Sequence, residues 1–125
     1  MRNRILIIDD EPDLSEIVKL AIDCFTDWQT DVAYTGEEGI KLAATKPYAA
    51  ILLDISMPDI DGFEVFEKLR SHPRTQSAPI ILLTAKVQPN DRLRFSSMNV
   101  AGIITKPFAS ETIATEIAGI LGWEM

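Results

Sequence analysis

Apolar residues occur along the chain in short uninterrupted runs, and each run stops at a polar side chain. The clearest runs are residues 5–8, 49–53 and 80–83. Such runs, bounded by residues that favour turns, are typical of strands buried on both faces of a parallel sheet. Residues 30–34 and 102–105 are predicted to form two shorter strands. The pattern therefore predicts five strands.

Between the strands, apolar residues recur at intervals of three and four, which is the spacing of one face of a helix. The first helix should begin at Pro12, because proline suits the first helical turn. Its predicted buried residues are Leu14, Ile17, Val18, Ala21, Ile22 and Phe25, with Cys24 as a further small buried residue.

Residues that favour helix N-caps precede the four remaining helical segments. These predicted caps are Thr35, Asp61, Asn90 and Ser110. The helix after Asn90 should be short and run from Asp91 to Met98, whereas the last helix should end at Gly122, a typical C-terminal stop.

Strand and helix thus alternate five times, which indicates an α/β fold with a doubly wound parallel sheet covered by helices on both faces. In such a sheet the carboxyl ends of all strands meet at one edge, and ligands bind there. The predicted strands end at Asp9 and Asp10, at Asp54, at Thr84 and at Lys106. We therefore expect these five side chains to converge on one site.

Each of these residues has an ordinary structural interpretation when it is taken alone. Asp9 and Asp10 could be a solvated helix start stabilised by the helix dipole, Thr84 a cap, and Lys106 a surface charge. Their occurrence at four strand ends of the same sheet edge favours a common function.

Three carboxylates held together repel one another unless a cation offsets their charge. An all-oxygen ligand set suits a hard cation, for which Mg²⁺ is the first expectation. Lys106 supplies a compact positive charge for a phosphoryl oxygen, and Thr84 supplies a hydroxyl donor. These groups together can support phosphoryl transfer to the carboxylate of Asp54.

Composition narrows the possible partners. The net charge of −7 argues against nucleic acid or an anionic membrane surface, and it suits metal cations or a basic protein patch. The 125 residues fit one domain, and the apolar run near the start is too short for a signal peptide or a membrane span. The only cysteine, Cys24, cannot form an internal disulfide, which is consistent with a cytoplasmic location.

Four motifs resemble a known family: IIDDE at residues 7–11, LDISMP at 53–58 followed by DG at 61–62, LLTA at 82–85, and TKPF at 105–108. Over nearly its whole length the chain resembles the receiver domain of two-component response regulators, the family of the bacterial chemotaxis regulator. The resemblance implies a flavodoxin-like (βα)5 fold with strand order 2-1-3-4-5. It also implies a single receiver domain over residues 1–125 without an output domain, or else a receiver fragment of a longer regulator.

The resemblance implies that Asp54 is the phosphoacceptor and that the donor is a phosphohistidine on a sensor histidine kinase or a histidine phosphotransfer protein. Mg²⁺ or Mn²⁺ would be bound directly by Asp10, Asp54 and the backbone carbonyl of Ser56, and by Asp9 through water. The chain would then be a phosphoacceptor that catalyses its own phosphotransfer and dephosphorylation, and not an enzyme acting on another substrate.

The resemblance further implies that Thr84 and Lys106 contact the phosphoryl oxygens. The kinase would dock beside the first helix and residues 107–108, and an unknown downstream protein would read the signal by protein contacts. Where the family usually carries an aromatic residue, three positions before the lysine, this chain has Ile103. We therefore expect phosphorylation chiefly to order residues 84–98, with little change at Ile103.

Other classes of protein fit the residues less well. A haloacid-dehalogenase-like phosphohydrolase with an aspartyl nucleophile would carry a second acid two residues after Asp54, where this chain has Ser56. A flavodoxin-like nucleotide or flavin module needs a phosphate-binding loop after the first strand, and residues 9–11 (Asp-Asp-Glu) would repel phosphate. A receiver-like domain that is never phosphorylated is disfavoured because all the expected reactive residues are present.

Overall fold

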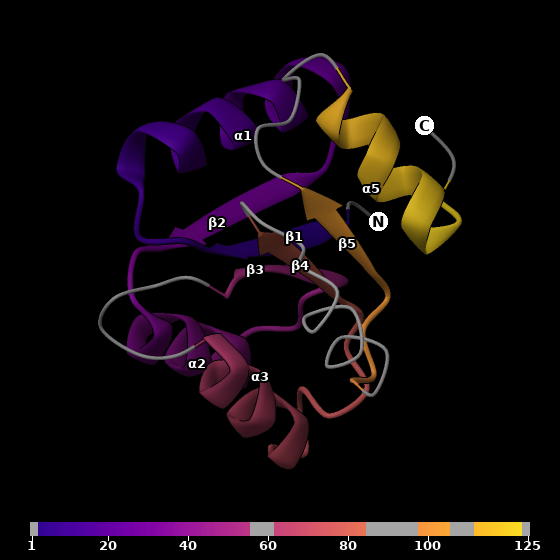
Figure 1. Ribbon diagram of the computed structural model, residues 1–125. Helices are drawn as coiled ribbons and strands as arrows, with labels where there is room; N and C mark the ends of the chain where they lie inside the picture. The colour runs from indigo at the N-terminus through magenta and orange to yellow at the C-terminus, as the bar shows by residue number, and fades with distance from the viewer. Residues whose placement is uncertain (1–2, 56–61, 85–97, 106–111, 124–125) are drawn as a thin grey trace.

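The computed structural model describes residues 3–55, 62–84, 98–105 and 112–123. Within them, five strands form one sheet with four helices packed on it (Figure 1). The strands are β1 (Arg4–Ile8), β2 (Gln29–Ala33), β3 (Ala50–Asp54), β4 (Ile80–Thr84) and β5 (Gly102–Thr105). The helices are α1 (Pro12–Phe25), α2 (Gly36–Thr45), α3 (Gly62–Ser71) and α5 (Ile113–Leu121).

All strand pairs are parallel, and the strand order is β2-β1-β3-β4-β5. This confirms the predicted doubly wound topology. β1, β3 and β4 have neighbours on both sides, and after the first residue of β1 every residue of these strands is buried. These strands have uninterrupted apolar sequences because neither of their faces meets water.

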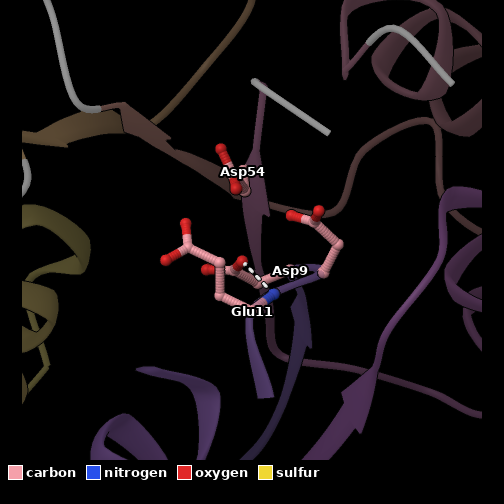
Figure 2. Close-up of side chains that lie close together, drawn as sticks. Asp9, Glu11 and Asp54 are labelled. Atoms are coloured by element: carbon pink, nitrogen blue, oxygen red, sulfur yellow. Dashed lines mark hydrogen bonds between the residues drawn. The ribbon is translucent and has the colours of Figure 1, made fainter. Parts of the chain in front are cut away.

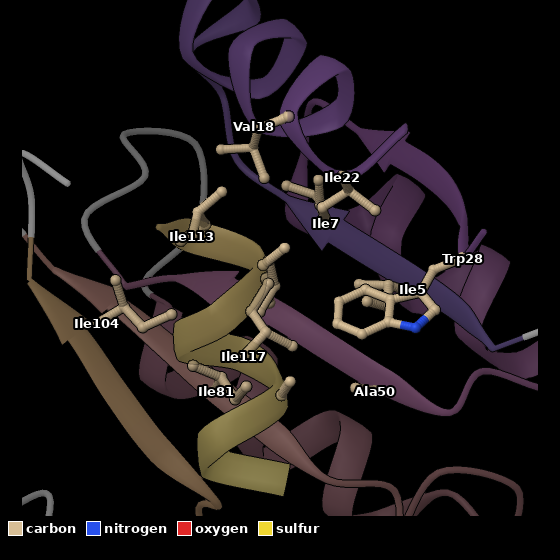
Figure 3. Close-up of a cluster of buried hydrophobic side chains, with 14 of the residues drawn as sticks. Ile5, Ile7, Val18, Ile22, Trp28, Ala50, Ile81, Ile104, Ile113 and Ile117 are labelled. Atoms are coloured by element: carbon tan, nitrogen blue, oxygen red, sulfur yellow. The ribbon is translucent and has the colours of Figure 1, made fainter. Parts of the chain in front are cut away.

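The helices cover both faces of the sheet. α1 and α5 lie on one face, and α2 and α3 lie on the other (Figure 1). Alternate residues of each strand point to opposite faces, so each face has its own core. On the α1 and α5 face the core includes Ile5, Ile7, Val18, Ile22, Trp28, Ala50, Ile81, Ile104, Ile113 and Ile117 (Figure 3). On the other face it comprises Leu6, Ile8, Ala33, Ala43, Ile51, Leu53, Val65, Phe66, Leu69, Ile80 and Leu82.

The two tryptophans of the chain meet at the margin of the first core. Trp28 follows α1 and is 5% exposed, and Trp123 follows α5. Their ring centroids are 5.1 Å apart and their planes are inclined at 79°, an edge-to-face arrangement that aromatic rings favour. Because helices run antiparallel to the strands in this topology, both rings lie near the amino ends of the strands.

Local signals account for the helix ends. Thr35 caps α2 as predicted, because its hydroxyl accepts a hydrogen bond from the Glu38 N–H at 3.1 Å. Gly122 ends α5 with a φ of 72°, which is the left-handed conformation that glycine adopts at little cost. α1 begins at Pro12 as predicted.

Gly62 allows α3 to begin directly against the backbone that leaves β3. A Cβ atom at this position would lie 2.2 Å from the Cα of Ile55, a distance that no real contact permits. The glycine therefore brings the start of α3 to the residue that follows Asp54.

The predicted buried face of α1 was wrong in part. Val18, Ala21 and Ile22 are buried, but Ile17 is 47% exposed and Phe25 is 55% exposed. Cys24 is exposed as well, and so it is not the buried residue that was predicted. Cys24 lies two residues beyond Ile22, about 200° around the helix, and therefore faces away from the sheet.

Several other predicted features lie outside the described residues. They are the caps at Asp61, Asn90 and Ser110, and residues 91–97 of the short helix that was expected to run from Asp91 to Met98. Met98 itself is described and is not helical. β2 begins at Gln29, one residue earlier than predicted, and ends at Ala33. None of the helices in the described part of the chain is long and apolar enough to cross a membrane.

Candidate functional site

The carboxyl ends of the central strands bring three polar residues to one edge of the sheet. Asp54 is the last residue of β3, Thr84 is the last residue of β4, and Asp9 follows β1 directly. All three residues are buried: Asp54 and Thr84 are each 2% exposed, and Asp9 is 1% exposed. The Asp9 N–H continues the β1–β2 ladder by donating to the Ala33 carbonyl at 3.0 Å. The polar groups are thus held by the ends of buried strands, which makes their placement rigid.

Four carboxylates gather at this edge. One oxygen each from Asp9, Asp10, Glu11 and Asp54 lies within 4.8 Å of the corresponding oxygens of the other three. Figure 2 shows the side chains of Asp9, Glu11 and Asp54 around a common space. The structure therefore brings together the three aspartates that the sequence pointed to, and it adds Glu11, which the sequence analysis had not assigned to the site.

The sequence Asp-Asp-Glu-Pro accounts for the shape of the acidic turn. The Glu11 N–H donates to Oδ1 of Asp9 at 3.0 Å, which holds the Asp9 carboxylate against the turn. Pro12 occupies the first position of α1 and disfavours a helical conformation at the residue before it. Glu11 accordingly has an extended backbone, with φ −97° and ψ 99°.

This cluster is suited to binding a metal ion. Carboxylate oxygens are hard ligands, and the four residues contribute no sulfur or imidazole, so a hard divalent cation fits better than a soft one. Two of the carboxylates belong to residues that are almost fully buried, where mutual repulsion is costly without a neutralising charge. The N-terminus of α1 also faces the cluster. The helix dipole there is equivalent to only a fraction of a unit positive charge, so it offsets little of the negative charge of the cluster.

Thr84 lies beside the end of β3. In the sheet register Asp54 is opposite Leu83, so Thr84 is one residue further along the neighbouring strand. Thr84 in turn is opposite Thr105 on β5, and Lys106 is the next residue in the chain. Lys106, Ser56 and the expected kinase contact at residues 107–108 lie outside the described residues.

Ile103 occupies the position where the aromatic residue was expected. It pairs with Leu82 in the register and is partly buried against the core on the α2 and α3 face. A branched aliphatic side chain fills this place, and it offers no hydroxyl for a hydrogen bond.

The comparison with protein families decides the identity of the domain. Residues 5–118 match the model of the response regulator receiver domain, a range that includes the acidic turn, Asp54 and Thr84. The chain belongs to the response regulator receiver domain family. This domain is a phosphoacceptor module of two-component signalling, and its standard role is phosphorylation on an aspartate by histidine kinases.

Known relatives agree with this assignment. The chain is 35% identical over 121 residues to the transcriptional regulatory protein SrrA of Staphylococcus aureus, and the match covers 97% of this chain and 48% of that protein. The chain therefore spans about half the length of the curated relatives it matches.

Solved structures of other receiver domains share the fold. The chemotaxis protein CheY4 of Vibrio cholerae superposes with a TM-score of 0.88 at 22% identity, covering 96% of this chain and 99% of that one. The receiver domain of the sensor histidine kinase PA1611 of Pseudomonas aeruginosa superposes with a TM-score of 0.84, also at 22% identity, covering 98% and 99% of the two chains. That structure holds a magnesium ion coordinated in its active site cleft.

A second charged cluster lies at the opposite, amino edge of this receiver domain. The Asp31 carboxylate on β2 accepts a hydrogen bond from the Tyr48 hydroxyl at 2.7 Å. Oδ2 of Asp31 also lies 3.3 Å from Arg4 on β1 and 3.6 Å from Lys46, which follows α2. One carboxylate thus ties two strands and the connection between α2 and β3.

The pKa values of this amino-edge cluster follow from its contacts. Burial by itself would raise the pKa of Asp31, but the hydrogen bond from Tyr48 and the charges of Lys46 and Arg4 outweigh it and lower the pKa below its ordinary value of 3.8. Burial, followed by the hydrogen bond to Asp31, raises the pKa of the Tyr48 phenol above its usual range. The network therefore favours an ionised aspartate and a neutral tyrosine.

Proposed function

We propose that this receiver domain accepts a phosphoryl group on Asp54 from a phosphohistidine of a sensor histidine kinase or a histidine phosphotransfer protein. The observation that supports this choice is the position of Asp54 at the end of the central strand β3, almost fully buried and within one acidic cluster with Asp9 and Asp10. A carboxylate oxygen of Asp54 attacks phosphorus, the bond from phosphorus to the imidazole nitrogen breaks, and the imidazole leaves with that electron pair.

The acidic residues have different tasks in this proposal. Asp10 and Asp54 bind a divalent cation, Mg²⁺ or Mn²⁺, directly, together with the backbone carbonyl of Ser56, and Asp9 acts through water. When bound, the cation neutralises charge on the phosphoryl oxygens. The carboxylate of Asp54 is then both a ligand and the nucleophile, so its strand must hold it firmly.

Thr84 and Lys106 act on the phosphoryl group itself. The Thr84 hydroxyl donates a hydrogen bond to one oxygen, and the ammonium of Lys106 pairs with another. Thr84 is the last residue of β4, the neighbour of β3, so the sheet sets its position relative to Asp54. Lys106 follows the last residue of β5 in the sequence. Positioning of this kind supplies most of the rate in phosphoryl transfer.

Turnover of a separate substrate is not part of the proposal. A phosphohydrolase needs an acid to protonate the leaving group, and the residue two positions after Asp54 is Ser56. The aspartyl phosphate would instead be hydrolysed within the same domain. The chain is thus a phosphoacceptor that catalyses its own phosphorylation and dephosphorylation.

The signal would pass to a downstream protein and not to nucleic acid or a membrane, because the net charge of −7 is unfavourable for both surfaces. Residues 1–125 would form one receiver domain. The partner would read residues 84–98 together with β5 and α5, and the kinase would dock beside α1 and residues 107–108. A cytoplasmic location remains a prediction.

Phosphorylation by a small donor tests the proposal. Incubation with acetyl phosphate and Mg²⁺ should add the mass of one phosphoryl group to the intact protein, and omission of Mg²⁺ or the substitution Asp54→Asn should prevent this. Asp13→Asn, which removes an exposed carboxylate from the first turn of α1, should be phosphorylated like the wild type. A phosphoryl adduct of undiminished yield in Asp54→Asn would show that another residue is the acceptor.

A further inference from the structure

The roles proposed above involve three of the four carboxylates in the acidic cluster. They assign no role to Glu11. Glu11 differs from the buried aspartates because it is exposed, so it borders the cluster on its solvent side. Nevertheless, one of its carboxylate oxygens lies within 4.8 Å of an oxygen from each of Asp9, Asp10 and Asp54. A side chain with this placement can contribute to whatever the cluster binds.

The backbone explains why Glu11 lies at the cluster. Glu11 is the N-cap residue of α1, but its side chain makes no capping hydrogen bond to the helix. Glutamate is a poor N-cap in comparison with aspartate, because its additional methylene carries the carboxylate past the free N–H groups. Pro12 and the hydrogen bond from the Glu11 N–H to Asp9 fix the backbone in an extended conformation. Figure 2 shows the resulting position of the Glu11 carboxylate beside Asp9.

We propose that Glu11 is a fourth carboxylate of the cation site, and that it raises the affinity for divalent cations and shifts the preference toward Ca²⁺ relative to Mg²⁺. This inference rests on the proposed function, since it assumes that the cluster binds a cation. Mg²⁺ keeps several of its waters and is usually bound by one or two carboxylates, whereas Ca²⁺ takes six to eight oxygen ligands in flexible geometry. A fourth carboxylate on a flexible side chain therefore strengthens the binding of Ca²⁺ more than the binding of Mg²⁺.

The expected size of the effect is moderate. Glu11 is exposed, so its charge acts through water and is screened by salt. Ordering its side chain also costs conformational entropy. We expect loss of the Glu11 charge to weaken Ca²⁺ binding about tenfold and Mg²⁺ binding about threefold.

Titration calorimetry of the unphosphorylated protein tests the inference. The dissociation constants for Mg²⁺ and for Ca²⁺ are measured at one ionic strength in the wild type, Glu11→Gln and Glu16→Gln. Glu16 is an exposed carboxylate of the same helix outside the cluster, so its substitution removes an equal charge and should leave both constants nearly unchanged.

A second variant separates charge from position. Asp at an N-cap turns its carboxylate back to the helix N–H groups. Glu11→Asp therefore keeps the charge but withdraws it from the cluster, and it should lose most of the Ca²⁺ preference, as Glu11→Gln does.

The outcomes distinguish the inference from the proposed function. Equal losses in Glu11→Gln and Glu16→Gln, or an unchanged ratio of the two dissociation constants in Glu11→Gln, would overturn the role of Glu11. In that case, if Asp54→Asn is titrated in the same way and loses cation binding, the proposed function still stands. If the wild type binds neither cation, the proposed function fails, and this inference fails with it.

Discussion

The two edges of the same sheet gather charged groups in opposite ways. At the amino edge, the single carboxylate of Asp31 contacts Arg4, Lys46 and Tyr48, so opposite charges and a hydrogen bond donor surround it. At the carboxyl edge, four carboxylates from the acidic turn and from β3 share one space. The first arrangement stabilises the folded chain. The second holds like charges close together, which suits the binding of a ligand of opposite charge.

The difference shows how a receiver domain separates stability from function. Buried strands fix the positions of Asp9 and Asp54, so the apolar cores on both faces of the sheet hold these like charges together. A fully buried isoleucine or leucine side chain contributes about 1.5–3 kcal/mol, and each core contains several of them. The cores can therefore sustain an acidic site that does not stabilise itself.

The largest expected effect comes from removing one carboxylate at the carboxyl edge. Asp10→Ala should abolish cation-dependent phosphorylation, since Asp10 is a proposed direct ligand. The same change should increase the free energy of unfolding in the absence of cation by about 0.5–1 kcal/mol, because repulsion is relieved. Intact mass after acetyl phosphate treatment and urea denaturation measure the two effects.

Asp13→Ala is the matched control for Asp10→Ala, because Asp13 lies in the first turn of α1 and outside the acidic cluster. It should keep phosphorylation. A variant Asp10→Ala that is less stable than the wild type without cation would contradict the expected repulsion among the carboxylates at this edge.

Removing the carboxylate at the amino edge should have the opposite effect on stability. Asp31→Asn should lower the free energy of unfolding by about 1–2 kcal/mol, because it leaves Arg4 and Lys46 without their counter-charge and weakens the bond from Tyr48. Phosphorylation at saturating donor should not change. Urea denaturation checks the loss, with the exposed Asp23→Asn as a control that should remain within a few tenths of a kcal/mol of the wild type. Equal stability of the two variants would mean that the network contributes nothing.

A smaller effect is expected from pH. Because the pKa of folded Asp31 lies below the ordinary 3.8, its contribution to stability is complete at pH values above 3.8 and is lost as the pH falls through the folded pKa. The difference in stability between the wild type and Asp31→Asn should therefore be constant near neutral pH and shrink in acid. Denaturation at several pH values measures this difference. A difference that grows in acid would show that the pKa of Asp31 is not lowered in the folded protein.

The strands were predictable because β1, β3 and β4 are apolar throughout and stop at a polar residue, a pattern with few alternatives. The buried face of α1 was less predictable, because that helix has apolar residues on two sides. Leu20, which is 59% exposed, and Ile17 alternate with buried Val18 and Ala21, so spacing alone did not identify the face on the sheet. Only the packing of α1 on β1 and β2 decides it.

The two charged clusters also differ in how well the sequence predicts them. The aspartates of the carboxyl edge could be inferred because each lies at the end of a strand or just after it, and parallel strands end together. Glu11 carried a signal in its position between an acidic pair and Pro12, but its side-chain direction depends on backbone angles that the sequence does not specify. The contacts of Asp31 were not predictable, because they join residues far apart in the sequence. The register pairs Asp31 with Leu6, so Arg4 lies diagonally across from Asp31, and Tyr48 comes from the connection between α2 and β3.

The edge-to-face pair of Trp28 and Trp123 has a spectroscopic consequence. These are the only tryptophans in the chain, and both lie near the amino ends of the strands, at the far end of the sheet from Asp54. Their fluorescence should change when the core between α1, β2 and α5 opens, and it should be nearly silent when a cation or a phosphoryl group occupies the carboxyl edge. Unfolding and ligand binding can therefore be followed by separate signals in the same unlabelled protein.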